Sequence, residues 1–486
     1  MIYLSAQPDE LYFVWQLEIQ LRNFKLLNIK RENIQVLIAY NKERGVSPRF
    51  QEFIDLNCDL AQIYCYPDLR VKPKYMSSIR PHILQQHFEL FPELEKETIF
   101  YHDSDILFSR VLQIEEIMIN DNCYVSDTRN YLDVNYIRRN GSEDLLDNML
   151  EIVGLDKDKL LLEDSQTGGA QYILKCINSD FWKKVEKDCE SLYVVMHEYN
   201  KTIWETEYSV NKIMRHSSKG IQAWCADMWA VLWNLWLDDR KVEIHSEMNF
   251  SWPFSSIIYW EKYAIQHYSG QISDKTKYFK KTEYLNYMPW YDHSLDSISN
   301  ISCSYEIVRK IKMRKDELDQ ERPIYVDSII LCNVLNDVDL INFKIFSTYI
   351  NKYINIPVKL ISQNNALHSL EFNRQSFYEF KEFEKFLIIS SQNLLSVNNI
   401  LKILNSRINL LFQPKNAFNV DSLFKEAFSK MLELELLIEN KGKLNVNTLS
   451  ESILWLDRGQ CENILFHKRT LMKLDTVSID EFYCLK

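Results

Sequence analysis

Glycine is scarce in this sequence, with 9 glycines among 486 residues. The loop after the first expected strand contains none, so neither a dinucleotide-binding fingerprint nor a P-loop is present there. CxxC pairs are also absent, and the ten cysteines follow no regular spacing. This usage favours reduced thiols over a disulfide framework or a zinc site. If the chain binds phosphates, side chains rather than a glycine-rich cradle are expected to meet them.

Positive charge and long apolar runs are lacking as well. The formal net charge is -11 and the isoelectric point is about 5.5, which argues against nucleic-acid binding because phosphate neutralisation needs a basic surface. No apolar run is long enough to span a bilayer, and no signal-peptide pattern opens the chain. We therefore expect a cytoplasmic protein without a nucleic-acid partner.

The chain is longer than one hydrophobic core usually serves, so two domains are expected. It opens with a predicted strand at Met1–Ser5, a helix at Tyr12–Leu27 and a second strand at Ile34–Ala39, a strand–helix–strand unit of an α/β fold. The loop after the first strand of such a unit lies at a sheet edge where nucleotides commonly bind. Ser5 and Gln7 are therefore predicted to bind a donor nucleotide.

Residues Ile99–Phe108 form the most informative stretch. An apolar segment enters, two aspartates follow one residue apart, and an apolar segment leaves, as expected when a buried parallel strand delivers carboxylates to its C-terminal end. Side chains at i and i+2 of an extended chain share one face, so Asp103 and Asp105 can hold one hard cation. The other two Asp-x-Asp triplets, at 156–158 and 337–339, lie in polar contexts without a directly preceding strand.

A basic loop precedes this stretch and contains Lys74 and Arg80. Either cation can meet a phosphate or a ribose, and a solvated basic turn is the alternative for each. A helix at Val111–Ile119 and a strand at Cys123–Asp127 are predicted to follow.

An adjacent glycine pair then stands before a predicted strand, in Gly168-Gly169-Ala170-Gln171. Glycine permits unusual backbone angles and close approach to a ligand, and a purely structural turn is the alternative. We predict that this run lines a donor site.

The next segment is an aromatic helix, Trp224–Trp236. Trp229, Trp233 and Trp236 share one helical face, which is more typical of a core than of a sugar platform. Asp227 lies among these rings and is predicted to act as a general base or an acceptor ligand, with a favourable charge near the helix N-terminus as the alternative.

His267 ends a short predicted strand and is followed by Gly270 and several lysines, of which Lys277 is predicted to face a diphosphate. A histidine at a strand end, after the paired aspartates, is predicted to be a third metal ligand, with core packing as the alternative.

From Met1 to about Asp292 these features resemble the GT-A family of nucleotide-sugar glycosyltransferases. The resemblance implies a Rossmann-like mixed sheet flanked by helices, Asp103 and Asp105 as ligands of a cation on the donor diphosphate, and Ser104 beside the ribose. His267 and Gly270 match the H-x-x-G pattern of glycogenin-like members. The helix with Asp227 is similar to the plant hydroxyproline arabinosyltransferase and serine galactosyltransferase groups, whereas the lysine–proline–tryptophan ending of glycogenin-like enzymes is loosened here.

The predicted function is metal-dependent transfer of a hexosyl or pentosyl group from a nucleotide sugar, expected to be a UDP-sugar, to a saccharide or glycoconjugate acceptor, as in polysaccharide biosynthesis. Two carboxylates and an imidazole suit Mn²⁺, or Mg²⁺, which stabilises the departing diphosphate. Retention or inversion stays open. The alternatives are a sugar nucleotidylyltransferase and a non-catalytic carbohydrate- or nucleotide-binding scaffold.

The predicted domains are a GT-A domain at residues 1–294, a linker helix at 295–322 and a smaller α/β domain at 323–486. The linker helix carries both apolar and basic residues, and a membrane-surface helix is its alternative. The C-terminal region repeats the opening strand–helix–strand rhythm, with Ser390 and Gln392 aligned to Asp103 and Asp105. It is predicted to be a degenerate, metal-free half-copy of the first domain, with chance similarity as the alternative.

Overall fold

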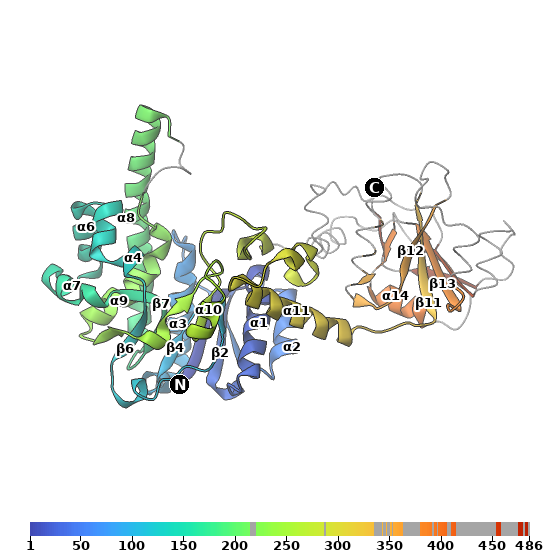
Figure 1. Cartoon of the computed structure of the whole chain (residues 1–486), viewed down its shortest axis with the longest axis horizontal. Helices are drawn as coiled ribbons and strands as arrows, with labels where there is room; N and C mark the ends of the chain where they lie inside the picture. Colours follow the sequence, from blue (N-terminus) through green and yellow to red (C-terminus); the bar gives the residue numbers. More distant parts are fainter. Residues whose placement is uncertain are drawn as a thin grey trace. The chain divides into compact units, whose positions relative to one another are not determined.

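The computed structural model describes residues 1–213, 220–285 and 288–334 and separate segments beyond them. These segments are 343, 347, 350–351, 353–362, 380–390, 393–395, 397–405, 410–414, 453–457, 475–479 and 482–484. The chain divides into two compact units (Figure 1). Unit 1 comprises Met1–Leu285 with His293–Lys312, and unit 2 comprises Asn286–Asp292 with Met313–Lys486.

A seven-stranded mixed sheet is the centre of unit 1, in the order β3-β2-β1-β4-β7-β6-β8. Its strands are β1 (Ile2–Pro8), β2 (Ile34–Asn41), β3 (Gln62–Asp68), β4 (Ile99–Tyr101), β6 (Cys123–Asp127), β7 (Gly168–Leu174) and β8 (Val242–Ile244). Strand β1 pairs in parallel with β2 and β4, whereas β7 runs antiparallel to β4 and β6. The predicted α/β fold class is confirmed, and the sheet is consistent with a GT-A Rossmann-like fold.

Helices cover both faces of this sheet (Figure 1). The helices of unit 1 include α1 (Leu11–Leu26), α2 (Pro48–Asn57), α3 (Ile79–Leu90), α4 (Arg129–Leu132), α5 (Val134–Asn140), α6 (Glu143–Val153), α7 (Lys157–Glu163), α8 (Ser179–Asn211), α9 (Ala226–Leu237) and α10 (Ile258–Lys262). Leu4 and Ala6 of β1 belong to the core formed with α3, α8 and α9, whereas Tyr3 contacts Phe24 of α1. This alternation follows from the two-residue period of a strand.

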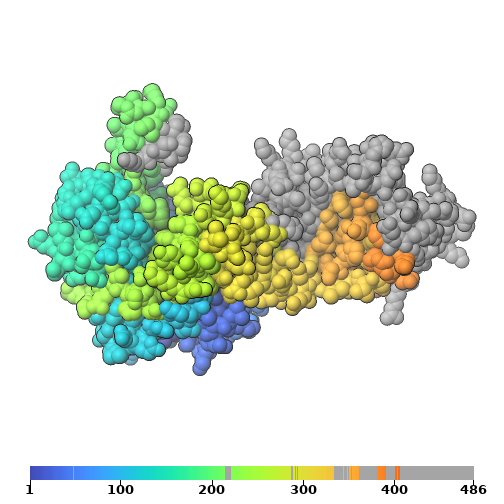
Figure 2. Space-filling view, viewed as in Figure 1, coloured from blue at the N-terminus to red at the C-terminus, as the bar shows by residue number. Residues whose placement is uncertain are grey.

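The tryptophans of α9 belong to the core, as predicted. Trp229, Trp233 and Trp236 are each at most 1% exposed. The C-terminal part of helix α8 projects away from the rest of unit 1 (Figure 2). The buried tryptophans pack α9 into the core, and Asp227 lies in the first turn of this helix.

Local sequence explains several helix ends. Ser142 caps α6 by accepting a hydrogen bond from Leu145 N, and Gly154 ends it in a left-handed conformation. Asp156 caps α7 through the backbone amides of Asp158 and Lys159. In the second Asp-x-Asp triplet, Asp156 is therefore a helix cap and Asp158 lies in the first turn, where a negative charge is favourable.

Two local predictions need correction. Strand β1 continues to Pro8, three residues beyond the predicted end, so Ser5 and Gln7 lie within the strand rather than in the loop after it. The helix predicted at Val111–Ile119 is wrong, since only a short 3-10 turn at Ile117–Ile119 forms there. Glu247 instead binds Gln113 N at 2.8 Å and holds this segment in a non-helical path.

A second, three-stranded sheet has the order β5-β10-β9. Its strands are β5 (Ile106–Phe108), β9 (Phe250–Ser251) and β10 (Ile265–His267). The antiparallel register pairs His267 with Ile106, directly after the paired aspartates. This pairing, between segments about 160 residues apart, brings the histidine to the carboxylates.

The described part of unit 2 contains a six-stranded sheet in the order β12-β11-β13-β16-β15-β17 and a pair of strands β14 and β18. Their bounds are β11 (Ser328–Val334), β12 (Val358–Ser362), β13 (Lys385–Ser390), β14 (Asn393–Leu395), β15 (Leu410–Pro414), β16 (Ile453–Asp457), β17 (Asp475–Ile479) and β18 (Phe482–Cys484), with helix α14 at Val397–Leu404. Strand β11 pairs in parallel with β12 and β13, and β13 pairs antiparallel with β16. The order repeats that of β2-β1-β4-β7, while Gln392 of the predicted alignment lies outside the described residues.

Helix α11 (Ser304–Glu321) occupies most of the predicted linker range. Its apolar residues Ile307, Val308 and Ile311 are at most 2% exposed. These side chains are therefore not available to a membrane surface. Elsewhere in the described ranges, no helix combines the length and hydrophobicity that a transmembrane span requires.

Candidate active site

Asp103, Asp105 and His267 form a cluster that fits a divalent cation. One possible ligand atom of each lies within 4.8 Å of those of the other two. His267 Nε2 is 3.2 Å from an oxygen of Asp105 and 3.7 Å from an oxygen of Asp103. Two carboxylates and an imidazole are donors that Mn²⁺ accepts, and the carboxylates alone suit Mg²⁺. This donor set agrees with the predicted metal ligands.

Two cations accompany these carboxylates. Lys281 forms an ion pair with Asp105, and Arg80 forms ion pairs with both Asp103 and Asp227. Burial alone would raise the pKa of Asp105, but the neighbouring Lys281 and His267 outweigh it and hold that pKa well below the usual range. Burial would likewise lower the pKa of Lys281, but Asp105 beside it raises that pKa instead. Both groups of this pair are charged at neutral pH.

Asp227 lies in the first turn of α9 and is 7% exposed. One of its oxygens is 2.7 Å from the Tyr75 hydroxyl, and the other contacts Arg80. Burial, and then the charge of Asp227, raise the pKa of Tyr75 well above its ordinary value. The phenol therefore stays protonated, and its hydrogen lies between two acceptors, this carboxylate and the Trp224 carbonyl oxygen at 2.6 Å.

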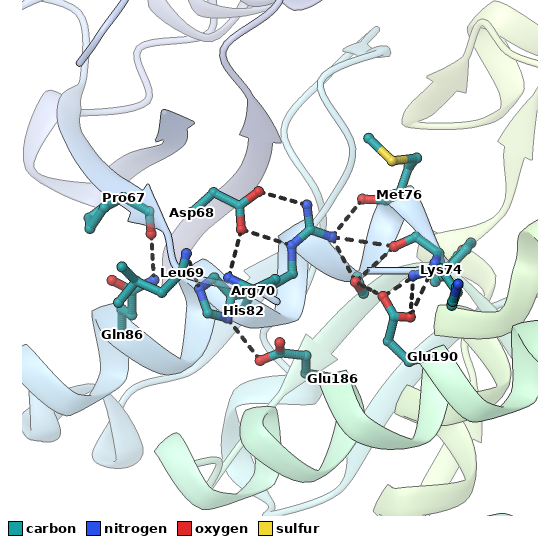
Figure 3. Close-up of polar contacts among 12 residues, drawn as sticks. Pro67, Asp68, Leu69, Arg70, Lys74, Met76, His82, Gln86, Glu186 and Glu190 are labelled. Carbon is teal, nitrogen blue, oxygen red and sulfur yellow. Dashed lines mark hydrogen bonds and ion pairs between the residues drawn. The ribbon is translucent and has the colours of Figure 1, made fainter. Parts of the chain in front are cut away.

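The loop that carries Tyr75 is itself fixed from two sides (Figure 3). Arg70 donates to Asp68 and to the carbonyl oxygen of Met76 at 3.1 Å. Glu190 of α8 accepts from the backbone amides of Lys74 at 2.8 Å and Tyr75 at 3.2 Å. The position of Asp227 thus depends on a loop whose backbone is anchored to α8.

Two cavities meet at this cluster. The β1 cavity, of about 670 Å³, extends along the C-terminal end of β1 and is lined by residues that include Asp9, Tyr12 and Arg44. The α9 cavity, of about 660 Å³, is lined by residues that include Trp224 and Asp227. Arg80, Asp103 and Lys281 line both cavities. The charged groups therefore lie at the junction of two spaces, each large enough for a small ligand.

Neighbouring side chains hold His267 in place. Gln171 Nε2 lies 3.2 Å from His267 Nδ1, and the Ser126 hydroxyl donates to Gln171 Oε1 at 2.7 Å. The Trp252 ring stacks on the imidazole with 5.8 Å between ring centroids. Such contacts orient a metal-ligating imidazole, so Gln171 lies beside the cluster rather than against the donor directly.

The glycine pair has a packing role that its sequence context did not reveal. A Cβ on Gly168 would lie 2.3 Å from Val125 Cγ2, and one on Gly169 would lie 2.8 Å from Met228 Cε. Both residues are buried in β7 and line neither cavity. Ala170, with a φ of 67°, does line the α9 cavity. The run reaches the site through Ala170 and Gln171.

The structure brings most of the predicted site residues to this junction. Those that line a cavity or contact the cluster are Arg80, Asp103, Ser104, Asp105, Ala170, Gln171, Asp227, His267 and Gly270. Ser5 and Gln7 are buried in β1 and line neither cavity, since strand alternation presents Ala6 and Pro8 to the β1 cavity instead. Lys74 and Lys277 are exposed and lie outside both cavities.

Two functional candidates were not predicted from the sequence. Lys281 supplies the cation at Asp105, although Lys277, which pairs with Asp274, was the predicted lysine. Tyr75 supplies the hydrogen bond to Asp227 and stood unremarked between Lys74 and Met76. A tyrosine beside the predicted basic residues was a signal for Tyr75, whereas no local pattern distinguished Lys281 from the lysines around it.

No protein-family model and no curated protein sequence matches the chain. Among solved structures, WbbM, a bifunctional glycosyltransferase, matches with 10% identity and a TM-score of 0.36 over 64% of this chain, which spans about half (52%) of that structure. The galactosyltransferase LgtC in complex with donor and acceptor sugar analogues matches with 13% identity and a TM-score of 0.31, covering 64% of this chain and 95% of LgtC. The glycosyltransferase GlyE of Streptococcus pneumoniae TIGR4 matches with 9% identity and a TM-score of 0.29, covering 80% of this chain and 90% of GlyE.

These three structures are glycosyltransferases by their names. Their TM-scores all lie below 0.5, so they say nothing further about donor, acceptor or mechanism of this chain. The functional proposal below rests on the residues at the junction of the two cavities.

Proposed function

We propose that this chain is a metal-dependent glycosyltransferase that moves a sugar from a UDP-sugar to a hydroxyl group of a saccharide or glycoconjugate acceptor. The observation that carries the proposal is the junction itself. Asp103, Asp105 and His267 form a cation site where two cavities meet, and Arg80 and Lys281 lie beside it. A donor and an acceptor must approach one another at such a point for group transfer.

The charges at the junction suit a diphosphate once a divalent cation is present. Three carboxylates, Asp103, Asp105 and Asp227, face two side-chain cations, which leaves one negative charge in excess when the imidazole is neutral. Bound Mn²⁺ or Mg²⁺ would reverse this excess and stabilise the charge that develops on the departing diphosphate. Arg80 and Lys281 both line the β1 cavity, where they could donate hydrogen bonds to phosphate oxygens.

The β1 cavity is the proposed donor-nucleotide site. It starts at Asp103, Ser104 and Asp105 and extends to Asp9 and Arg44 at the ends of β1 and β2. Parallel strands end there, which is where α/β sheets bind nucleotides. Ser104 lies in this wall beside the proposed ribose, and its hydroxyl donates at 3.1 Å to Gln16, which lines the same cavity.

The α9 cavity is the proposed acceptor site. Trp224, 63% exposed, and Trp252 line it. The Trp252 ring is stacked on His267 and Phe254, so Trp224 is the ring proposed to meet the apolar face of a sugar. The carboxylate of Asp227 can accept a hydrogen bond from an acceptor hydroxyl while Tyr75 and Arg80 hold it. In this proposal Asp227 orients that hydroxyl and draws off its proton as the new bond forms.

Unit 2 is proposed to be the metal-free half-copy expected from the sequence, used for acceptor binding or association. The shared strand order and strand directions of β12-β11-β13-β16 and β2-β1-β4-β7 support this proposal. The domain boundaries near residues 294 and 322, and the cytoplasmic location, remain predictions from the sequence.

Release of free UDP tests the proposed reaction. The full chain is incubated with a panel of UDP-hexoses and UDP-pentoses, with Mn²⁺ or with a chelator, and free UDP is measured. We expect release from at least one donor, dependent on the metal and increased by saccharide acceptors. Pyrophosphate release from UTP and a sugar phosphate would instead favour a nucleotidylyltransferase, and no release of either kind would favour a binding scaffold.

A further inference from the structure

The four residues His102–Asp105 carry the chain from one sheet to another. Strand β4 ends at Tyr101 in the seven-stranded sheet, and β5 begins at Ile106 in the three-stranded sheet. Backbone groups in such a crossing need partners outside the regular ladders, because unpaired buried amides and carbonyls are costly. Asp103 and Asp105 lie in this crossing, so groups that hold the backbone of the crossing also hold the two aspartates in position.

Helix α1 supplies those partners from a stripe of buried amide side chains. Gln16, Gln20 and Asn23 lie at i, i+4 and i+7 and are each at most 2% exposed, so they share one helical face. We call this set the α1 amide stripe. Its three side chains contact the crossing or strand β5, and Gln16 also lines the β1 cavity.

Gln20 makes the central contacts. Its Nε2 donates to Asp103 O at 3.0 Å and lies 3.4 Å from Ile106 O. The amide thus ties the backbone of the first aspartate to the start of β5, across the second aspartate. Its Oε1 has no hydrogen-bond partner among the described residues, so only the donor end of this side chain binds the crossing.

The other two amides bind the ends of the same segment. Gln16 Oε1 accepts from the Ser104 hydroxyl at 3.1 Å. Asn23 brackets Phe108, accepting from its backbone N at 2.7 Å and donating to its carbonyl O at 2.9 Å. Strand β5 is an edge strand, and Asn23 occupies the free edge that a neighbouring strand would otherwise take.

Three buried amides on one helix face are unusual where apolar side chains would fill the same space, because buried polar groups need partners. Every one of these amides contacts the segment Asp103–Phe108. A second element also holds this segment: β10 supplies His267, and Tyr268, the residue after β10, donates its backbone N to Asp105 O at 3.0 Å. The crossing is therefore held by contacts from both α1 and the end of β10.

We propose that the α1 amide stripe is a positioning device for the metal site, with Gln20 as its main positioning residue. It fixes the backbone between Asp103 and Asp105 so that both carboxylates and His267 converge before a cation binds. This inference rests on the proposed metal site, and it assigns to α1 a role that no ligand contact reveals. Groups that orient metal ligands typically change metal affinity 10- to 100-fold when they are removed.

Calorimetric titration of Mn²⁺ into the full-length protein tests the proposal. Gln20→Met keeps the side-chain length and removes the donor, and we expect its Mn²⁺ affinity to fall 10- to 100-fold. Asn200→Leu is the matched control, because Asn200 brackets Ile221 with two amide–backbone contacts of 2.7 and 2.8 Å, as Asn23 brackets Phe108. The control is expected to lose stability and to keep its Mn²⁺ affinity within about twofold.

Hydrogen exchange on the metal-free proteins separates this inference from the proposed function. We expect faster exchange of the backbone amides from His102 to Phe108 in Gln20→Met, and unchanged exchange there in Asn200→Leu. Wild-type affinity and wild-type exchange in Gln20→Met would overturn the positioning role while leaving the metal site intact. Absence of Mn²⁺ binding by the wild type would overturn the proposed function and, with it, this role.

Should Gln20→Met fail to fold, Gln16→Met provides the second test. It removes the acceptor of the Ser104 hydroxyl and leaves the contacts of Gln20 in place. A weaker Mn²⁺ affinity in this variant, by several-fold, would support the proposal. An affinity equal to that of the wild type, together with unchanged exchange from His102 to Phe108, would contradict it.

Discussion

Lys281 opposes metal binding in the nucleotide-free protein, and removing its charge should reveal this. Lys281 pairs with one oxygen of Asp105, while the other oxygen of that carboxylate faces His267. If Lys281 stays in place, its positive charge repels Mn²⁺. If it moves away, its ion pair with Asp105 must first be broken. In both cases Mn²⁺ binding is weakened. Lys281→Met should therefore bind Mn²⁺ alone more tightly than the wild type.

The size of the effect follows from the geometry. Two charges about 4 Å apart interact by roughly 4 kcal/mol at an effective dielectric constant of about 20. Asp105 and Lys281 are 4% and 21% exposed in their side chains, so desolvation offsets part of that energy. About 1–3 kcal/mol should remain, which corresponds to roughly 5- to 150-fold tighter Mn²⁺ binding.

The same variant should bind UDP more weakly when Mn²⁺ is saturating, because a charged hydrogen bond to the diphosphate, worth about 1.5–3 kcal/mol, is lost. Calorimetry measures both affinities. Lys277→Met is the matched control, since Lys277 is exposed and pairs only locally with Asp274, and it should behave as the wild type in both titrations. Unchanged or weaker Mn²⁺ binding by Lys281→Met would refute the reasoning.

Three further predictions concern packing, pH and the acceptor side. Gly168→Ala should lose about 1–3 kcal/mol of unfolding free energy in urea titrations, because its Cβ would lie 2.3 Å from Val125 Cγ2; wild-type stability would contradict this packing role. Burial lowers the pKa of His87 from 6.5 to about 4. As the pH falls, His87 is therefore protonated in the unfolded chain before it is protonated in the folded one. The unfolding free energy should fall by up to about 3 kcal/mol as the pH drops from 6.5 to 4. The same pH dependence in His87→Gln would exclude His87 as its source. Asp227→Asn should reduce turnover about 100-fold or more while Mn²⁺ affinity is unchanged; near-normal turnover would remove Asp227 from the chemistry.

Local pattern was sufficient for the framework of unit 1. The hydrophobic alternation and helical spacing of the first forty residues predict β1, α1 and β2, and the stretch from Ile99 predicts the strand that ends at the aspartates. The strand before His267 was predicted for the same reason. These features depend on residues close together in sequence, where side-chain periodicity carries the information.

Long-range contacts explain what the sequence could not show. Lys281 pairs with Asp105 across 176 residues, and nothing in its neighbourhood separates it from Lys277. The apolar spacing from Val111 to Ile119 indicates a helix, yet Glu247 binds Gln113 N and only a 3-10 turn forms at the end of this segment. The α1 amide stripe was not predicted either, because glutamines in a helix usually face solvent and only the fold shows that these are buried.

Isothermal calorimetry with UDP, in the presence and absence of Mn²⁺, tests the central claim most directly. The wild type is compared with Asp105→Ala and with Asp158→Ala, a control from the second Asp-x-Asp triplet, in which Asp156 caps α7 and Asp158 lies in its first turn. Metal-dependent UDP binding that is lost in Asp105→Ala and kept in Asp158→Ala is the predicted result. UDP binding that ignores the metal, or that survives in Asp105→Ala, would contradict a metal-dependent nucleotide-sugar site.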